Sequence, residues 1–218
     1  MSSVAGQLID TVARERRMSG GERTNPAAPR IVVISGPSGT GKTTVVRRLL
    51  LAARVPLMKA VTATTRSPRS GEINDVDYHF LALDEFQRRR AADAFLETAE
   101  VFGAGTWYGT PRSEVERIAA AGAWTLLEID VHGALEIKRQ FPEAVMIFLR
   151  TATLDEYEAR LRRRGTESEE AIGHRLARMR EELRQADRYD FQVINDDVDR
   201  AVAEIDGILQ RHEASHNA

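Results

Sequence analysis

The fold is decided by a stretch near the start of the chain, Ile31-Val32-Val33-Ile34-Ser35-Gly36-Pro37-Ser38-Gly39-Thr40-Gly41-Lys42-Thr43. Its first four residues are a continuous apolar, β-branched run, typical of a strand buried on both faces of a parallel sheet. From Gly36 the sequence matches G-x-x-x-x-G-K-[ST] in full, and a helix is predicted from about Lys42 to Ala53. Strand, glycine-rich turn and helix in this order predict a loop that binds the phosphates of a nucleotide.

The chemistry of this loop follows from its residue types. Its glycines let the backbone turn tightly and aim N–H groups at phosphate oxygens, and the start of the helix adds a positive dipole end. Lys42 is expected to reach the β- and γ-phosphates, and the Thr43 hydroxyl is expected to ligate Mg²⁺. The predicted triphosphate-binding residues are Gly36, Pro37, Ser38, Gly39, Thr40, Gly41, Lys42, Thr43 and Thr44.

The rest of the chain alternates strands with helices. Residues 124–130, 144–149 and 191–195 repeat the buried-strand pattern, and helices are predicted over 133–141, 153–164 and about 198–210. This alternation predicts an α/β fold, a central parallel sheet flanked by helices. Residues 213–218 are expected to form a C-terminal tail.

Two segments interrupt the alternation. Residues 62–110 show short strand patterns, aromatic residues and turns around one helix (84–91), which predicts a small, partly antiparallel insertion between core segments 30–61 and 111–212. Residues 160–184 form an arginine-rich helical pair with Gly165 at the break. Residues 1–29 mix small and charged residues and end in a proline-rich stretch, so we expect a disordered N-terminal extension there.

Composition limits the possible partners. The 218 residues include 31 Lys and Arg, 33 Asp and Glu, and no cysteine. The near-neutral balance gives no electrostatic footprint for a nucleic acid polymer or an anionic membrane, and no apolar run approaches the ~18 residues needed to span a bilayer. The lack of cysteine excludes disulfides and thiolate sites and fits the reducing cytoplasm, where we expect the protein. Only three of the basic residues are lysines (Lys42, Lys59 and Lys138), and one of them stands where the phosphate loop requires it.

The insertion carries the candidate acceptor site. Residues 62–72 (Thr-Ala-Thr-Thr-Arg-Ser-Pro-Arg-Ser-Gly-Glu) place Arg66 and Arg69 three residues apart around a proline, and guanidinium forks bind phosphate oxygens bidentately. Tyr78, Glu97 and Tyr108 follow. Taken singly, each of these residues has an ordinary alternative as a surface charge or a half-buried strand residue. A GTPase would need an N-K-x-D-type segment for base recognition, and Asn195-Asp196-Asp197 lacks the lysine.

Together these motifs resemble guanylate kinases, P-loop enzymes that phosphorylate GMP to GDP with ATP. The resemblance covers residues 30–212, and its most specific pieces are residues 64–72, Asp77-Tyr78-His79-Phe80, Arg164-Gly165-Thr166-Glu167 and Val193-Ile194-Asn195-Asp196-Asp197. It implies a P-loop NTPase fold with a GMP-binding insertion and a helical lid. It also implies ATP and GMP as partners, dGMP as a further acceptor and Mg²⁺ with the ATP; monomer and homodimer both stay open.

The resemblance assigns roles residue by residue. Arg66, Arg69, Tyr78 and Tyr108 would hold the phosphate of GMP. Glu97 would accept from the guanine N1–H and amino group, and Thr62 and Thr110 would add hydroxyls toward the base. Glu128, where an aspartate is also common, would lie toward the acceptor and Asp130 toward Mg²⁺. In the lid, Arg164 and Arg175 are the expected catalytic arginines beside Lys42 and Arg66, with Arg160 a weaker candidate. Asn195 would contact the adenine side of ATP.

One departure and two alternatives accompany this interpretation. The segment between Glu97 and Tyr108 is about two residues longer than is usual in the family, which makes the roles of Tyr108 and Thr110 less secure. A non-catalytic module that grips phosphorylated partners could dispense with the phosphate loop, so the intact loop argues against it. A kinase for another phosphorylated acceptor, such as a sugar phosphate, would have no use for Glu97 and Thr62.

Overall fold

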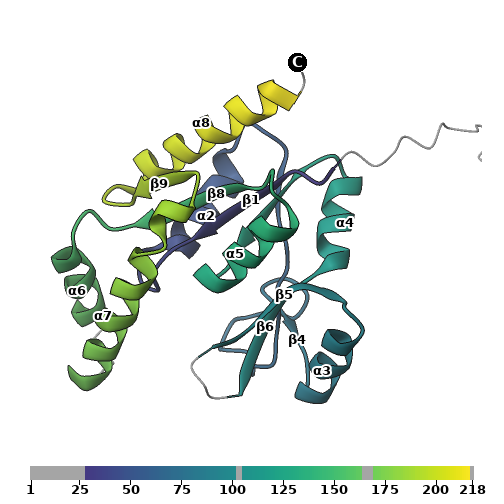
Figure 1. The fold of residues 1–218 in the computed structure, drawn as a ribbon, viewed down its shortest axis with the longest axis horizontal. Helices are drawn as coiled ribbons and strands as arrows, with labels where there is room; N and C mark the ends of the chain where they lie inside the picture. The colour runs from purple at the N-terminus through teal and green to yellow at the C-terminus, as the bar shows by residue number, and fades with distance from the viewer. Residues whose placement is uncertain (1–27, 102–104, 164–168, 217–218) are drawn as a thin grey trace, which may run out of the picture.

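The computed structural model describes residues 28–101, 105–163 and 169–216. Its main sheet contains five strands, all parallel, in the order β2-β7-β1-β8-β9. These strands are β1 (Ile31–Ser35), β2 (Leu57–Lys59), β7 (Trp124–Glu128), β8 (Val145–Arg150) and β9 (Phe191–Ile194). Helices cover both faces of the sheet (Figure 1), and the predicted α/β architecture is confirmed.

Successive side chains of the buried strands point to opposite faces of the sheet, so a separate hydrophobic core forms on each face. Val32 and Ile34 pack toward α2 (Lys42–Ala52) and α8 (Val198–His216), whereas Ile31 and Val33 belong to the opposite core. The opposite core also takes residues of α4 (Arg112–Ala120) and α5 (Val131–Gln140). The central strand is therefore fully buried, as its apolar run predicts.

A second sheet lies apart from the main one, beside α3 (Leu83–Ala91) in Figure 1. Its order is β4-β3-β6-β5, from β3 (Ala63–Thr64), β4 (His79–Phe80), β5 (Phe95–Val101) and β6 (Thr106–Pro111). The β3–β4 pair is parallel, and β6 is antiparallel to both β3 and β5. Of the acceptor candidates, Glu97 lies in β5, and Tyr108 and Thr110 lie in β6. The others lie just outside the strands: Thr62, Arg66, Arg69 and Tyr78.

The arginine-rich segment forms α6 (Leu154–Arg163) and α7 (Glu169–Leu183), followed by the short 3-10 helix η1 (Ala186–Arg188). Arg162 joins the two long helices, with its Nη2 donating to Glu169 Oε2 at 2.9 Å. Gly165 and Arg164 lie outside the described residues. In Figure 1, α6 and α7 lie at the lower left and the second sheet lies at the lower right.

One predicted boundary is wrong. We expected the last helix to end near Gln210 and a tail to follow over 213–218, whereas α8 continues to His216. Glu213 explains the extension, because its carboxylate accepts from Arg30 Nη1 at 2.7 Å and from Trp124 Nε1 at 2.6 Å. The residues of the expected N-terminal extension up to residue 27 lie outside the described part of the chain. None of the helices in the described ranges combines the length and apolarity needed to cross a membrane.

Candidate active site

A cavity of about 270 Å³ lies at the carboxyl edge of the main sheet. Its walls come from the phosphate loop and strand ends, from the second sheet, and from α7. The sequence-predicted residues that line it are Gly36, Ser38, Lys42, Thr62, Tyr78, Glu97, Tyr108, Glu128, Asp130 and Arg175. Candidates from both sides of the expected reaction therefore share one cavity.

The phosphate loop depends on glycine at two positions. Gly36 has φ 137°, and a Cβ there would lie 2.1 Å from the carbonyl oxygen of Leu149. Gly41 has φ 91°, and a Cβ would lie 2.5 Å from Asn195 Nδ2. A larger residue at either position would have to adopt a disfavoured backbone conformation. Its Cβ would also collide with an atom at the end of a neighbouring strand. The loop leads directly into α2 at Lys42.

Lys42 folds over the loop from the first turn of α2. Its Nζ donates to the carbonyl oxygens of Gly36 at 2.6 Å and Pro37 at 3.0 Å. Burial lowers the pKa of Lys42 from its ordinary value, and nearby carboxylates, Glu128 first, act against that shift. The half-buried ammonium group is well suited to bind phosphate oxygens, because charges interact more strongly when they are partly shielded from water.

Thr43 contacts Glu128 and not Asp130. The Thr43 hydroxyl donates to Glu128 Oε1 at 2.6 Å, and Lys59 Nζ donates to Glu128 Oε2 at 2.8 Å. Burial acts to raise the pKa of Glu128, but Lys59 and Thr43 outweigh it, so the pKa lies below its usual value. Asp130 instead caps α5, accepting from the N–H of Gly133 at 2.9 Å. We expected Asp130 on the metal side and Glu128 toward the acceptor; in the structure it is Glu128 that contacts Thr43, the expected metal ligand.

Arg66 makes several side-chain hydrogen bonds within the insertion. Its Nη1 and Nη2 donate to the Glu72 carboxylate at 2.7 and 2.9 Å, and its Nε donates to the Tyr108 hydroxyl at 3.3 Å. The guanidinium also lies 5.2 Å from the ring centre of Tyr78. The hydrogen bonds from the Arg66 guanidinium, followed by the one from the Arg69 backbone, lower the pKa of Glu72 to about 2. Arg69 is exposed, and its backbone N–H donates to Glu72 at 2.7 Å.

Glu97 is a buried carboxyl group, with 6% of its surface exposed. The register of β5 and β6 pairs it with Thr110, whose hydroxyl donates to Glu97 Oε1 at 2.7 Å. Burial raises the pKa of Glu97 to about 7, the Thr110 hydrogen bond opposes the shift, and the negative charge of Asp130 adds to it. Residues 102–104 of the longer segment lie outside the described residues, but Ala99 still pairs with Tyr108 in this ladder.

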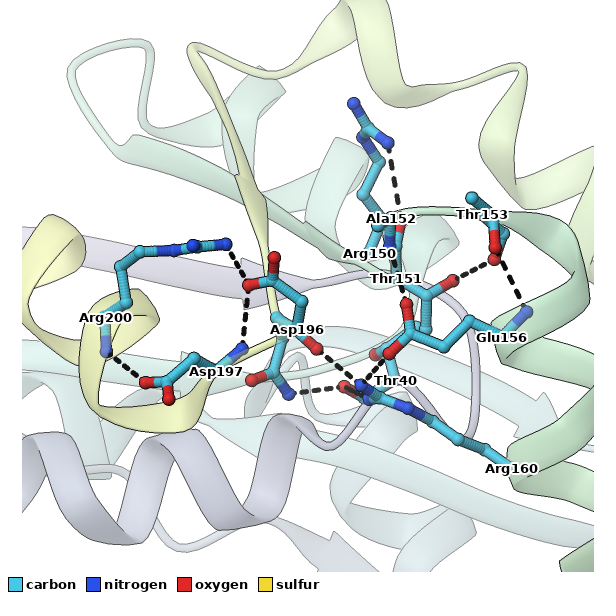
Figure 2. Close-up of polar contacts among 11 residues, drawn as sticks. Thr40, Arg150, Thr151, Ala152, Thr153, Glu156, Arg160, Asp196, Asp197 and Arg200 are labelled. Carbon is cyan, nitrogen blue, oxygen red and sulfur yellow. Dashed lines mark hydrogen bonds and ion pairs between the residues drawn. The ribbon is translucent and has the colours of Figure 1, made fainter.

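The arginine-rich helices contact the phosphate loop directly. Arg175 Nη2 donates to Ser38 Oγ at 2.8 Å, and the buried Tyr157 hydroxyl donates to the Ser38 carbonyl. Arg160 of α6 donates from Nη1 to the Thr40 carbonyl at 3.3 Å and also pairs with Glu156 (Figure 2). These contacts join the expected lid to the loop that it would cover.

A second hollow, of about 370 Å³, lies on the other side of the loop and is lined by Thr44, Arg160 and Asn195 among others. Asn195 Nδ2 donates to the Thr40 carbonyl at 2.7 Å, and the Asn195 carbonyl accepts from Arg160 Nη2 at 2.6 Å. The side-chain Oδ1 of Asn195 is buried without a partner in the described structure. Asp196 and Arg200 form an ion pair at the rim around the start of α8 (Figure 2).

Comparison with known proteins decides the family. The family model described as guanylate kinase matches residues 28–212. The chain belongs to the guanylate kinase family.

Relatives and a solved structure agree with this assignment. The chain is 47% identical over 181 residues to the guanylate kinase of Rhodopirellula baltica, covering 83% of this chain and 87% of that protein. It is 47% identical over 175 residues to the guanylate kinase of Neisseria gonorrhoeae, covering 80% and 84%. The crystal structure of guanylate kinase from Anaplasma phagocytophilum aligns with a TM-score of 0.68 at 31% identity, covering 85% and 87%. The resemblance found in the sequence is confirmed.

For this member of the guanylate kinase family, sequence reasoning missed four residues at the cavity and its supports. Lys59, Tyr157 and Arg178 line the cavity, and Glu72 orients Arg66. The scarcity of lysine was a signal for Lys59, because only three lysines occur in the chain. Glu72 is the last residue of the motif that contains Arg66, so a contact between the two could also have been predicted. Arg164 lies outside the described residues and keeps its role only as a prediction.

Proposed function

We propose that this chain transfers the γ-phosphoryl group of ATP to GMP and releases ADP and GDP. The observation that carries the proposal is one cavity lined by a phosphate-loop lysine, Lys42, and by a buried carboxyl group, Glu97, suited to a guanine edge. Membership in the guanylate kinase family supports the same activity.

Glu97 would select the base. Guanine presents two adjacent donors, N1–H and the 2-amino group, and an ionised carboxylate accepts from both. Adenine presents no such pair, so the buried carboxylate would lose both donors of the base and AMP would be rejected. Thr110 would hold one oxygen of Glu97, and Thr62 would add a hydroxyl at the cavity wall. These roles concern the base and not the 2′-hydroxyl, so dGMP should also be an acceptor.

Arg66, Arg69, Tyr78 and Tyr108 would bind the acceptor phosphate. Two guanidinium groups neutralise a dianion, and two phenols fix its orientation. Arg66 already donates to Glu72, Tyr108 and the Ser67 carbonyl, so its position is set before a phosphate arrives. This pre-organisation supports a site for a phosphate of fixed position.

Phosphoryl transfer would depend on positioning and charge, with no side chain acting as a strong base. Lys42 and the loop N–H groups would hold the β- and γ-phosphates, and Arg175 would stabilise charge on the group in transfer; Arg164 is proposed for the same role. Helices α6 and α7 would exclude water that could otherwise hydrolyse ATP. Asn195 offers a buried acceptor, Oδ1, for the adenine amino group.

Mg²⁺ fits the oxygen donors beside the loop. Thr43 and Glu128 offer a hydroxyl and a carboxylate, the hard ligands that Mg²⁺ prefers, with Asp130 nearby at the same cavity. Within the described ranges no group of three or more His, Asp or Glu residues could hold a metal, so ATP phosphates and water would complete the ligand set. When bound, Mg²⁺ neutralises charge on the β- and γ-phosphates.

A coupled ADP-release assay tests the proposal. ATP and Mg²⁺ are supplied with GMP, AMP, UMP or a sugar phosphate in turn. ADP release with GMP and not with the others is expected. Folded protein that releases no ADP with GMP would refute the proposal, and release with the sugar phosphate would favour the alternative kinase. Lys42→Ala serves as the control, since it should lose turnover far more than GMP binding.

A further inference from the structure

The first turn of α5 lies directly against the side chain of Glu97. Gly133 is buried in this turn, and its N–H donates to the capping carboxylate of Asp130 at 2.9 Å. A Cβ at Gly133 would lie 2.9 Å from Glu97 Oε2, 3.1 Å from Glu97 Cδ and 3.5 Å from Glu97 Cγ. The three nearest atoms to that empty position thus all belong to the residue that selects the base.

The backbone does not require glycine here. Gly133 is absent from the positive-φ residues, which include Gly36, Gly39 and Gly41 in the phosphate loop. Glycine within a helix is less favourable than alanine, because it loses more conformational freedom on folding. Alanine would therefore favour α5 itself, and the nearest atoms that its Cβ would meet outside the helix belong to Glu97.

We propose that Gly133 is a positioning residue for guanine selection, since its missing side chain lets Glu97 place its carboxylate between Thr110 and α5. This inference rests on the proposed function. Thr110 holds Oε1 at 2.7 Å from one side, while Gly133 leaves room for Oε2 on the other. A methyl group at 133 pushes the far end of a flexible side chain, so the carboxylate moves and the helix stays in place. The N1–H and 2-amino groups of guanine then face carboxylate oxygens that are out of position.

The test compares Gly133→Ala with Gly207→Ala, a matched substitution in the middle of α8. A Cβ at Gly207 would only meet Arg211 Nη1 at 3.5 Å, an ordinary contact with a flexible side chain. For Gly133→Ala, we expect KM for GMP to rise roughly 5- to 100-fold, as for one mispaired buried contact, with kcat near that of the unaltered chain. The preference for GMP over IMP, which lacks the 2-amino group, should shrink. Gly207→Ala should change neither value, and Tm should stay equal or rise in both variants.

Three outcomes would overturn the inference. An unchanged KM and GMP preference in Gly133→Ala would show that the carboxylate is not displaced. A joint fall of Tm and kcat would indicate a structural role only. An undiminished effect of Gly133→Ala in a Glu97→Ala background, where the contacted side chain is gone, would show that it does not act through Glu97.

Three further results separate the remaining possibilities. Should Gly133→Ala not fold, adding Glu97→Asp withdraws the carboxylate by one methylene and is expected to restore folding; failure to do so would refute the contact. An unaltered chain that does not phosphorylate GMP refutes the proposed function and this inference with it. Normal GMP turnover with unchanged Gly133→Ala kinetics refutes the inference alone.

Discussion

Glu97→Gln should make the protein more stable and a poorer guanylate kinase. Burial raises the pKa of Glu97 from 4.5 to about 7 in the folded chain. Between these two pH values the folded state holds a proton that the unfolded state has lost, so stability falls as pH rises through this window. At pH 8 this rise in the pKa from 4.5 to about 7 amounts to about 3 kcal/mol of lost stability.

Glutamine removes this cost because it never ionises, and Thr110 can still donate to its carbonyl oxygen. The free energy of unfolding should therefore rise by up to about 3 kcal/mol at pH 8 and by about 1 kcal/mol at pH 5. Urea denaturation at the two pH values measures both. Glutamine also presents an amino group to the two guanine donors, so GMP use should weaken by about 1–3 kcal/mol, measured as kcat/KM.

Glu114→Gln is the matched control, since Glu114 is also buried but the side chain of Arg117 lowers its pKa. Its substitution should destabilise the protein at pH 8, and that loss should fade as pH falls below about 4.5. Equal stability changes for Glu97→Gln at pH 5 and pH 8 would refute the account of its burial. Unchanged GMP kinetics would refute its assignment to the base.

Three other substitutions test separate parts of the site. Lys59→Met should lower kcat roughly tenfold and shift the acid limb of the pH–rate profile to higher pH, because the Glu128 carboxylate loses its cation. The control is Lys138→Met, which breaks a distant ion pair and should change neither kcat nor the profile. Glu72→Gln should raise KM for GMP roughly tenfold with little change in kcat, as steady-state kinetics would reveal, since Arg66 loses its orienting carboxylate. Gly36→Ala should reduce the free energy of unfolding by about 3 kcal/mol or more in urea, and a stability within 1 kcal/mol of the unaltered chain would contradict the contact with the neighbouring strand.

Much of the fold could be predicted because its strands are buried on both faces. The runs beginning at Ile31 and Ala144 have no polar interruption, so the pattern alone predicts a parallel sheet. Strand β2 was missed, since its three residues are half-buried and give no periodic signal. Helix α4 was missed too: it starts directly after strand β6, without a loop to separate the two patterns.

The site was predictable where one motif contains the chemistry. The phosphate loop and Arg66 lie in short motifs whose spacing indicates phosphate binding. The contact of Glu128 with Thr43 could not be predicted, because 85 residues separate them in the sequence. The bond of Asp130 to the N–H of Gly133, at the start of α5, could not be predicted either. The contact of Gly133 with Glu97 likewise depends on how α5 packs on β5, which no local pattern contains.

The most direct test follows the phosphorus atoms themselves. ATP, Mg²⁺ and GMP are incubated with the protein, and the products are identified by ³¹P NMR. We predict ADP and GDP in equal amounts, with no inorganic phosphate beyond the background. Formation of ADP and inorganic phosphate without GDP would contradict transfer to GMP and show that the site hydrolyses ATP instead.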